Sequence, residues 1–176
     1  MIAKANMNEF AAGVAGRNKH FGDAHNPWDL NRWPGGSSSG TGVSIAAGLC
    51  LGGLGTDTGV SVRGPAGWLG LVGVRPSYGR VSVRGIFPRA YSFDTVGPLA
   101  HTVADAGVRQ FTVPVSFTGF PALSVPCGFD SSGLPIGLQI VANDFQEQLL
   151  FRIARALERE SEFSSKRPST YWQGAA

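Results

Sequence analysis

The sequence predicts an α/β fold, and three observations carry that prediction. Val43 to Leu51 is an apolar segment of small residues, which is typical of a tightly packed, buried helix. The second half of the chain holds short Val-, Leu- and Phe-containing segments separated by Gly and Pro, a pattern that favours strands. Gln146 to Phe163 spaces its apolar residues by three and four, as an amphipathic helix does. We therefore expect a sheet with helices packed outside it.

Length and composition indicate one globular domain over residues 1–176. The chain is 43% hydrophobic and only 15% charged, below the roughly 25% charge of an average soluble domain. Its 25 glycines are about twice the usual share of ~7%, so turns and close backbone approaches should be frequent. This composition excludes a coiled coil, and the hydrophobic content excludes a disordered chain.

Charge and hydropathy exclude several classes of function. The net charge is +3 and no Lys or Arg cluster concentrates it, so we expect no nucleic-acid partner. No apolar run reaches the ~20 residues of a membrane span, and Met1 to Phe10 has no apolar stretch of a secretory signal, so we predict a cytoplasmic location. Cys50 and Cys127 stand among apolar residues, where buried thiols in a reducing compartment are expected. Neither a metal nor a cofactor is indicated.

The first half of the chain alternates short elements with loops. A short helix is predicted near Met7 to Ala15, followed by a loop over Arg17 to Trp33. The glycine-serine stretch Gly35 to Gly42 leads into the apolar helix Val43 to Leu51, which a glycine run ends. Leu69 to Val83 mixes Val and Leu with Gly and Pro, which suits small strands and tight turns.

The second half is predicted as three strands and a helix. The strands are Phe111 to Phe117, Ala122 to Phe129 and Pro135 to Ala142. The helix Gln146 to Phe163 should cover one side of the sheet, and the polar tail from Ser164 should fray. The apolar face of that helix consists of Leu149, Leu150, Ile153, Ala154 and Leu157.

Two glycine-rich loops flank the predicted buried helix. They are Gly35 to Gly42 and Thr56 to Arg63, and Ser61 lies 24 residues after Ser37. A buried helix between the loops would bring the second back to the first. Glycine lets backbone N–H groups converge where an oxyanion develops, so serines in such loops suit acyl transfer. The first loop alone is equally a flexible connection or a helix cap, and it lacks the Gly-Lys-Ser/Thr ending of a phosphate-binding loop.

Three motifs cover the two loops and the segment that follows them: Pro34-Gly-Gly-Ser-Ser-Ser-Gly, Gly55-Thr-Asp-Thr-Gly-Val-Ser-Val-Arg-Gly-Pro-Ala and Gly73-Val-Arg-Pro-Ser-Tyr-Gly-Arg-Val. These motifs resemble the amidase signature family, which includes the glutaminase component of a tRNA-dependent amidotransferase. Supporting segments span 4–10, 26–29, 94–100, 120–129 and 134–140. The resemblance implies a reduced core of the family's α/β fold, with a mixed twisted β-sheet flanked by helices.

The resemblance also implies a serine mechanism. Members use a Ser-Ser-Lys triad, and Ser61 matches the nucleophile. Ser37 matches the bridging serine, whose peptide bond is cis in the family, while Ser38 and Ser39 compete for that assignment. The backbone donors implied for the oxyanion hole belong to Thr58, Gly59, Val60 and Ser61.

The resemblance further implies a supporting ion pair between Asp57 and Arg63, which would fix the nucleophile turn; an ordinary surface pair is the other interpretation. Val60 stands where the family prefers glycine, and its Cβ is expected to disfavour a positive φ or to narrow the oxyanion site.

Two family segments have no counterpart in this sequence. The first holds the triad lysine, and Lys4 matches a different lysine of the family. Substitutes for the missing base are sought among Lys4, Lys19, His20, His25 and His101. The second is the long middle region, so the domain is interpreted as a serine-loop core (1–107), a junction (108–110), C-terminal strands and a helix (111–163) and a tail (164–176).

The predicted function is that of a serine hydrolase cleaving small amides or esters through an acyl-Ser61 intermediate. Without the lysine, esters should react better than amides, because an amine leaving group needs a proton. The alternative is a catalytically impaired remnant that serves as a binding or assembly module, and a glutaminase working with tRNA-dependent machinery has less support. Apolar surface left by the absent segments predicts a homo-oligomer.

Overall fold

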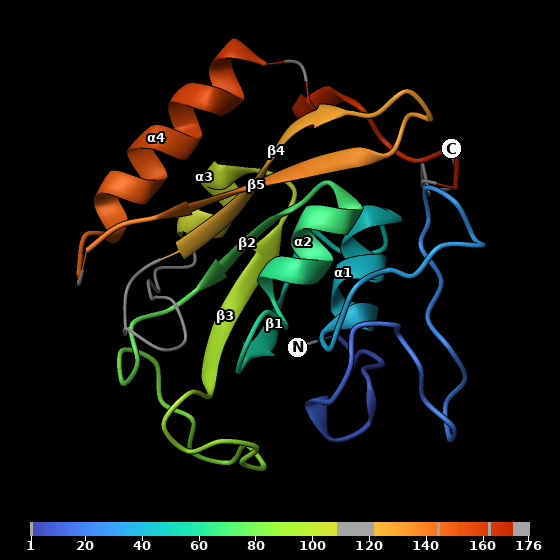
Figure 1. Cartoon of the computed structure of the whole chain (residues 1–176), viewed down its shortest axis with the longest axis vertical. Coiled ribbons are helices and arrows are strands. Elements are labelled where there is room, and N and C mark those ends of the chain that lie inside the picture. Colours follow the sequence, from blue (N-terminus) through green and yellow to red (C-terminus); the bar gives the residue numbers. More distant parts are fainter. Residues whose placement is uncertain (1, 109–121, 144, 162, 171–176) are drawn as a thin grey trace.

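The central feature of the fold is a five-stranded sheet with the order β1-β3-β2-β4-β5 (Figure 1). The computed structural model describes residues 2–108, 122–143, 145–161 and 163–170. The predicted strand Phe111 to Phe117 and part of the junction lie outside these residues. The strands are β1 (Gly52–Asp57), β2 (Val72–Arg75), β3 (Thr95–Ala100), β4 (Ala122–Phe129) and β5 (Pro135–Val141).

The α/β prediction is confirmed, and the strand pairing is more uniform than the mixed sheet expected. All four neighbouring pairs among the described strands are antiparallel. One physical reason is local: a tight turn at Asp130 to Leu134 joins β4 to β5, and a hairpin can only pair its strands antiparallel.

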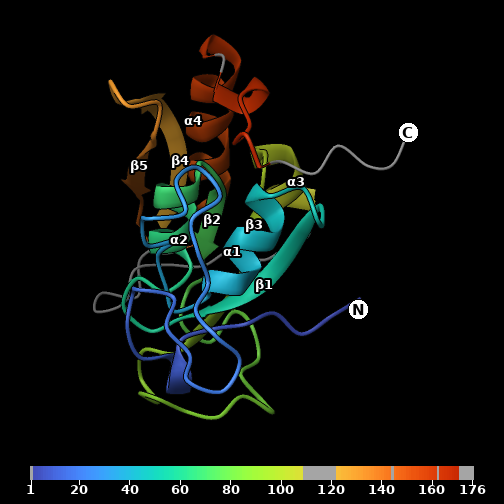
Figure 2. The ribbon, with the colours of Figure 1, turned by 90° about the vertical axis from the view of Figure 1, so that its right-hand side faces the viewer.

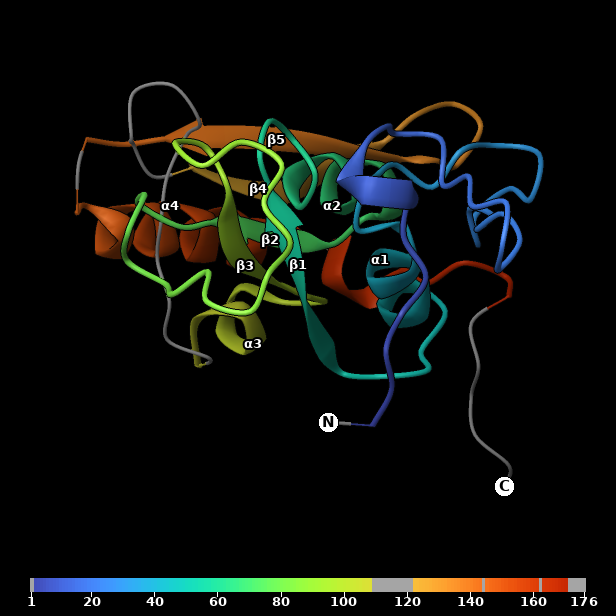
Figure 3. The ribbon, with the colours of Figure 1, turned by 90° about the horizontal axis from the view of Figure 1, so that it is seen from below.

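Helices cover both faces of the sheet. Helices α1 and α2 pack on one face, and α3 and α4 lie on the opposite face (Figures 1 and 2). In the view from below, α3 and α4 again lie apart from α1 and α2 (Figure 3). The helices are α1 (Ser39–Ala46), α2 (Arg63–Leu69), α3 (Val103–Val108) and α4 (Glu147–Glu160), with short 3-10 turns at Glu9–Ala11 and Phe163–Ser165.

Each face of the sheet has its own apolar core. On the α1/α2 side the buried residues are Ile45, Ala46, Val62, Ala66, Leu69, Leu71 and Leu99. On the α3/α4 side they are Val72, Val74, Ala100, Val103, Ala106, Leu123, Val125, Leu150 and Ala154. Leu99 and Ala100 are consecutive in β3 and enter opposite cores, as the two-residue period of a strand requires.

The helix predicted near Met7 to Ala15 is wrong, because only the 3-10 turn Glu9–Ala11 forms there. Phe10 and Ala11 have positive φ angles of 52° and 55°, which an α-helix does not tolerate. The buried Asn8 side chain accepts a hydrogen bond from the Gly16 N–H at 3.2 Å and so closes a loop instead. Residues 17–33 form loops and turns, which confirms that prediction.

The region around the glycine-rich loops holds more regular structure than predicted. The buried helix begins at Ser39, within the glycine-serine stretch, and ends at Ala46 rather than Leu51. The glycine run from Gly52, predicted only to end the helix, forms strand β1 together with the first two residues of the predicted second loop, and α2 begins at the last residue of that loop, Arg63. Leu69 to Val83 contributes a single strand, β2, rather than several. The sequence pattern did not predict β1 and α2 because both contain glycine or proline, which have low intrinsic propensity for strands and helices.

The second half follows the sequence pattern closely. Strands β4 and β5 and helix α4 stand within three residues of their predicted bounds. On α4, Leu150 and Ala154 are buried, but Leu149 and Ile153 are 41% and 40% exposed, so the predicted apolar face is wider than the buried one. The prediction of a buried Cys127 is wrong: its thiol lies on the exposed part of β4, and Cys50 is half-buried. Among the described residues, no helix is long and apolar enough to cross a membrane.

Candidate active site

The two serine loops meet at one end of the sheet. The Ser38 N–H donates a hydrogen bond to the Ser61 carbonyl oxygen at 3.1 Å. Helix α1 carries the chain away from the first loop and strand β1 brings it back, so that the second loop lies beside the first. A Cβ at Gly55 would overlap the Ser38 side chain, so glycine is what allows β1 to approach this closely.

The three serines of the first loop differ in what their hydroxyls contact. Ser38 Oγ donates to the Thr56 carbonyl at 3.3 Å and accepts from the Thr56 N–H at 3.2 Å. Ser39 Oγ donates to the Ser37 carbonyl at 3.5 Å. Ser37 is fully buried, yet its Oγ has no hydrogen-bond partner among the residues that the structure describes. Its hydroxyl is therefore the one that remains available for a reaction.

Ser37 itself is held by its backbone. The Gly36–Ser37 peptide bond is cis, as the resemblance implied. The Ser37 carbonyl accepts a hydrogen bond from the Asn8 N–H at 3.1 Å. The segment that precedes the first loop by nearly thirty residues thus forms part of its support.

Asp57 is the buried centre of the second loop. Its carboxylate is fully buried and forms ion pairs at 3.0 Å with both Arg63 and Arg75. Asp57 Oδ2 also accepts the backbone N–H groups of Val62 and Arg63, at 3.1 and 3.3 Å. These bonds fix the chain on both sides of Ser61. The interpretation of Asp57 and Arg63 as an ordinary surface pair is therefore wrong.

The charge state of Asp57 follows from two opposing effects. Burial raises the pKa of the carboxyl group, but the hydrogen bonds and charges of Arg63 and Arg75 outweigh burial. The pKa of Asp57 is held below its ordinary value of 3.8, so the group is ionised at neutral pH.

Arg75 is a supporting residue to which the sequence analysis gave no role. Its guanidinium donates to the Asp57 carboxylate and carbonyl and, at 2.6 Å, to the Phe93 carbonyl. Thr95 Oγ1 donates to the same Asp57 carbonyl at 2.9 Å. The signal in the sequence was an arginine placed among valines in a short apolar run, because an arginine inside a buried strand needs a buried anion.

Arg63 links this turn to the far part of the chain. Its guanidinium donates to Gln139 Oε1 on β5 at 2.9 Å and to the Gly59 carbonyl. The C-terminal hairpin and the nucleophile turn are therefore joined through one side chain.

The backbone donors predicted for an oxyanion hole lie together in the turn after β1. Within the described part of the chain, the N–H groups of Thr58, Val60 and Ser61 donate no hydrogen bond. Thr58 Oγ1 donates to Asp94 Oδ1 at 2.6 Å, which anchors the start of the turn. Gly59 belongs to the same turn, and its carbonyl accepts the Arg63 bond.

Val60 fits the turn without a left-handed backbone. It is absent from the described non-glycine residues with positive φ, so the expected conflict between its Cβ and a positive φ does not arise, whereas narrowing of the oxyanion site stays a prediction. The side chain is 40% exposed, and Val60 Cγ2 lies 3.3 Å from the position that a Cβ at Gly64 would take. Its isopropyl group thus borders the first turn of α2 beside the serine loops.

Within the described residues, none of the five candidate bases forms a hydrogen bond with Ser37 or Ser61. His101 follows β3 at the end paired with Gly52, whereas Asp57 pairs with Thr95, about 17 Å away along the strands. Burial and the nearby Arg167 charge lower the pKa of His101. His20 lies 3.7 Å from Glu9, and His25 Nδ1 contacts the Leu30 carbonyl at 3.0 Å.

The two lysines among these candidates differ in position. Lys4 and Lys19 are both exposed. Lys4 precedes Asn6, whose carbonyl accepts the Gly40 N–H at 2.9 Å, so it is the lysine closest along the chain to a contact with the first loop.

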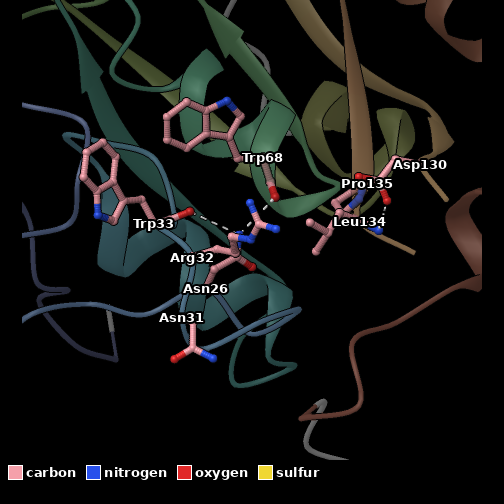
Figure 4. Close-up of a pocket in the computed structure, with 8 residues that line it drawn as sticks. All are labelled: Asn26, Asn31, Arg32, Trp33, Trp68, Asp130, Leu134 and Pro135. Carbon is pink, nitrogen blue, oxygen red and sulfur yellow. Dashed lines mark hydrogen bonds between the residues drawn. The ribbon is translucent and has the colours of Figure 1, made fainter. Parts of the chain in front are cut away.

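A pocket of about 450 Å³ is lined by residues other than the serines (Figure 4). It is bordered by the loop before the first serine loop, by the C-terminal end of α2 and by the β4–β5 turn. Asn26 Nδ2 holds its wall by donating to the Trp33 and Trp68 carbonyls at 3.2 and 3.4 Å. Since Ser61 precedes the opposite end of α2, this pocket is not the place of the serine chemistry. Its lining residues are Asn26, Asn31, Arg32, Trp33, Trp68, Asp130, Leu134 and Pro135.

The sequence profile of the Amidase family matches residues 1–109 and 106–151 of this chain. The chain belongs to the amidase family. Within the described residues, no group of three or more His, Cys, Asp or Glu side chains could hold a metal ion.

Curated relatives of this chain include the A subunits of glutamyl-tRNA(Gln) amidotransferase. The one from Prochlorococcus marinus subsp. pastoris is 51% identical over 112 residues, which cover 64% of this chain and 23% of the relative. The one from Pediococcus pentosaceus is 40% identical over 146 residues, covering 78% of this chain and 30% of the relative. The chain thus spans about a quarter of the length of the curated relatives it matches.

Solved structures show the same fold. The A subunit of glutamyl-tRNA(Gln) amidotransferase from Thermotoga maritima superposes with a TM-score of 0.85 at 21% identity, covering 97% of this chain and 76% of that chain. A peptide amidase in complex with the competitive inhibitor chymostatin is 40% identical over 57% of this chain and 22% of that chain, with a TM-score of 0.56. The reduced amidase-signature core expected from the motifs is confirmed.

Proposed function

We propose that this chain carries the acyl-transfer centre of an amide hydrolase, with Ser61 as the nucleophile and Ser37 as the residue that takes its proton. One observation carries the proposal above all: Ser37 Oγ is buried, has no partner within the described part of the chain, and lies in a loop that is hydrogen-bonded directly to Ser61. A buried hydroxyl without a partner is costly, and such groups concentrate where a reaction uses them.

The reaction follows from this arrangement. Ser61 Oγ attacks the carbonyl carbon of the substrate, and its proton passes to Ser37 Oγ as the Ser37 hydroxyl gives up its own proton. In an amide that second proton goes to the leaving nitrogen, and in a phenyl ester it goes to water. The carbonyl oxygen becomes an oxyanion that accepts the N–H groups of Thr58, Val60 and Ser61. The carbon–nitrogen bond of an amide then breaks and the amine departs with the proton from Ser37, or the carbon–oxygen bond of a phenyl ester breaks and the phenolate departs without one. In both cases acyl-Ser61 remains. Water hydrolyses this ester and restores the Ser61 hydroxyl.

Esters are proposed to react faster than amides of the same acyl group. An amine leaves only after protonation, whereas a phenolate leaves unprotonated, and acid-base assistance contributes about 10² to 10⁴ fold to a rate. All three lysines of the chain, Lys4, Lys19 and Lys166, are exposed. The amide reaction therefore loses more of its rate than the ester reaction.

The exposed lysines also favour a second candidate, a catalytically impaired remnant that serves as a binding module. Ser37 Oγ then stays unpartnered because no general base reaches it. In this alternative the fold and the Asp57 cluster are kept but turnover is absent.

Hydrolysis of paired substrates separates the two candidates. We would measure p-nitrophenyl butyrate and butyryl p-nitroanilide with the wild-type chain, with Ser61→Ala and with Ser132→Ala, a control in the exposed β4–β5 turn. The proposal predicts faster ester than anilide turnover, lost in Ser61→Ala and kept in Ser132→Ala. Equal turnover by Ser61→Ala contradicts it, and no turnover by a folded wild-type chain supports the binding module.

We also propose that the chain forms a homo-oligomer in a reducing compartment such as the cytoplasm. Ile136 and Leu138 of β5 and Leu149 and Ile153 of α4 are 40% to 47% exposed, and β5 is an edge strand. Both cysteines are free. Light scattering at micromolar concentration should give a molar mass of at least twice the 18.5 kDa of one chain. A molar mass equal to that of one chain contradicts the proposed homo-oligomer.

A further inference from the structure

A second cavity lies on the other face of the sheet, between α3 and α4. Its volume is about 650 Å³. Its floor is apolar and its rim on α4 is basic. The lining residues are Val103, Ala104, Phe151, Arg152, Arg155, Ala156 and Arg159, and we call this cavity the arginine groove.

The three arginines form one row along α4. Their spacing of three and then four residues places them on one side of the helix, over about 10 Å along its axis. All three are exposed. No described carboxylate forms an ion pair with any of them. Like charges at this spacing destabilise a helix, so the fold gains nothing from the row itself.

The acidic groups nearest the groove in the described structure are already engaged. Glu158 Oε1 accepts the Val103 N–H at 3.0 Å and so caps the start of α3. Asp105 of α3 accepts a hydrogen bond from Thr102 Oγ1 at 2.6 Å. Among the described residues neither carboxylate forms an ion pair with the row, so the guanidinium groups of the row remain able to bind the carboxylates of a ligand.

The shape and chemistry of the groove select among anionic ligands. Nucleic acids are held by stacking on exposed aromatic rings and by long basic tracks. Here the single aromatic residue, Phe151, is half-buried and packs against the apolar core, and the row has only three cations. An apolar floor beside regularly spaced charges instead matches a helix that carries acidic and apolar residues side by side.

We propose that the arginine groove is a docking site for an amphipathic acidic helix of a partner protein. The carboxylates of that helix, spaced by three and four residues, pair with Arg152, Arg155 and Arg159. Its apolar side chains cover Val103 and Phe151. Arginine suits this role because its planar guanidinium binds a carboxylate through two parallel hydrogen bonds.

Fluorescence polarisation with defined probes tests the proposal. The probe is a labelled 14-residue helical peptide with Glu at three- and four-residue spacing beside a Leu stripe. The comparison probes are the same peptide with Gln in place of Glu and a labelled 12-residue oligothymidylate. The proteins are the full chain, Arg155→Glu, the triple charge reversal of the row, and Arg84→Glu as an exposed control in the β2–β3 loop. Circular dichroism and thermal unfolding establish that each variant is folded.

The proposal expects the Glu peptide to bind the full chain and Arg84→Glu equally. It expects the Glu peptide to bind Arg155→Glu at least tenfold more weakly than the full chain, and the Gln peptide to bind the full chain at least tenfold more weakly than the Glu peptide does. A further peptide with Lys in place of Glu should bind the triple charge-reversal variant, which restores charge complementarity. Ser61→Ala should bind the Glu peptide as the wild type does, which separates this site from the hydrolase. Equal loss in Arg84→Glu, no binding at low salt, or tighter binding of the oligonucleotide overturns the proposal.

Discussion

Two clusters of arginines in this chain have opposite surroundings. Around Asp57, the Arg63 and Arg75 side chains are 5% and 1% exposed and share one buried carboxylate. In the arginine groove, Arg152, Arg155 and Arg159 are exposed and have no described ion-pair partner. The first set of charges is bound into the fold, whereas the second is open to a ligand.

The difference has a simple physical basis. A charge inside a protein is tolerated only when it is paired and hydrogen-bonded, so the partners of a buried charge become mutually dependent. An exposed guanidinium is solvated by water and contributes little to stability until a ligand displaces that water. Mutations should therefore affect stability at the first cluster and binding at the second.

Removal of the Asp57 charge should have the largest effect on stability. Asp57→Asn leaves Arg63 and Arg75 buried with no anion, and breaking a buried pair in this way costs about 3 to 5 kcal/mol. Urea unfolding measures the loss. The control Glu160→Gln, an exposed carboxylate near the end of α4, should stay within about 0.5 kcal/mol of the wild type. A loss below about 1 kcal/mol at Asp57 would show that the cluster is not the buried support described here.

A smaller loss is expected at Gly97, where the strands beside Asp57 approach most closely. A Cβ at this position would overlap the Val74 carbonyl oxygen of β2, so Gly97→Ala forces β2 and β3 apart. Such overpacking costs about 1 to 3 kcal/mol. Gly128→Ala on β4 is the matched control, because a Cβ there would meet nothing within 4 Å. Equal unfolding midpoints in urea for the two variants would contradict the packing of β3 against β2.

The sequence predicted some of these features and not others, for physical reasons. Strands β4 and β5 and helix α4 follow from local periodicity and from the turn at Asp130. Strand β1 was not predicted because three of its six residues are glycine. Helix α2 was not predicted because it contains Gly64, Pro65 and Gly67. Neighbouring strands, rather than intrinsic propensity, stabilise these elements.

At the candidate site, the spacing of the two loops predicted that Ser37 and Ser61 lie near each other, and the family resemblance implied the ion pair between Asp57 and Arg63. Neither predicted Arg75 or Gln139, which reach Asp57 and Arg63 from 18 and 76 residues away. Contacts between distant segments depend on the strand order, which local patterns do not encode. The sequence alone could not decide among the three serines of the first loop. The structure distinguishes them by the hydrogen bonds of their hydroxyl groups.

Acid should weaken the Asp57 cluster gradually. The pKa of Asp57 is lower in the folded chain than its ordinary value of 3.8, so the unfolded chain binds the proton first as pH falls. The stability from this group is fully present above about pH 4 and is lost below it, by about 1.4 kcal/mol per pH unit until the folded pKa is passed. The free-energy gap between the wild type and Asp57→Asn should therefore narrow from about pH 4 to about pH 2.5. A constant gap would show that Asp57 is not ionised in the fold.

Truncation in the arginine groove should have the smallest effect on stability. Arg155→Ala removes a like-charge pair with Arg159, so unfolding in urea should change by no more than about 0.5 kcal/mol, with a slight gain expected. A loss comparable to that of Asp57→Asn would mean that the row supports the fold and would remove the contrast between the two clusters.

The most direct measurement of the central claim is labelling with phenylmethanesulfonyl fluoride followed by peptide mass spectrometry. If the Asp57-anchored turn and the first serine loop form a reactive centre, one adduct should form on Ser61. It should be absent in Ser61→Ala, at least tenfold slower in Ser37→Ala and unchanged in Ser132→Ala. A folded wild-type chain that stays unlabelled, or that carries its adduct on another serine, would contradict the assignment of Ser61 as the nucleophile.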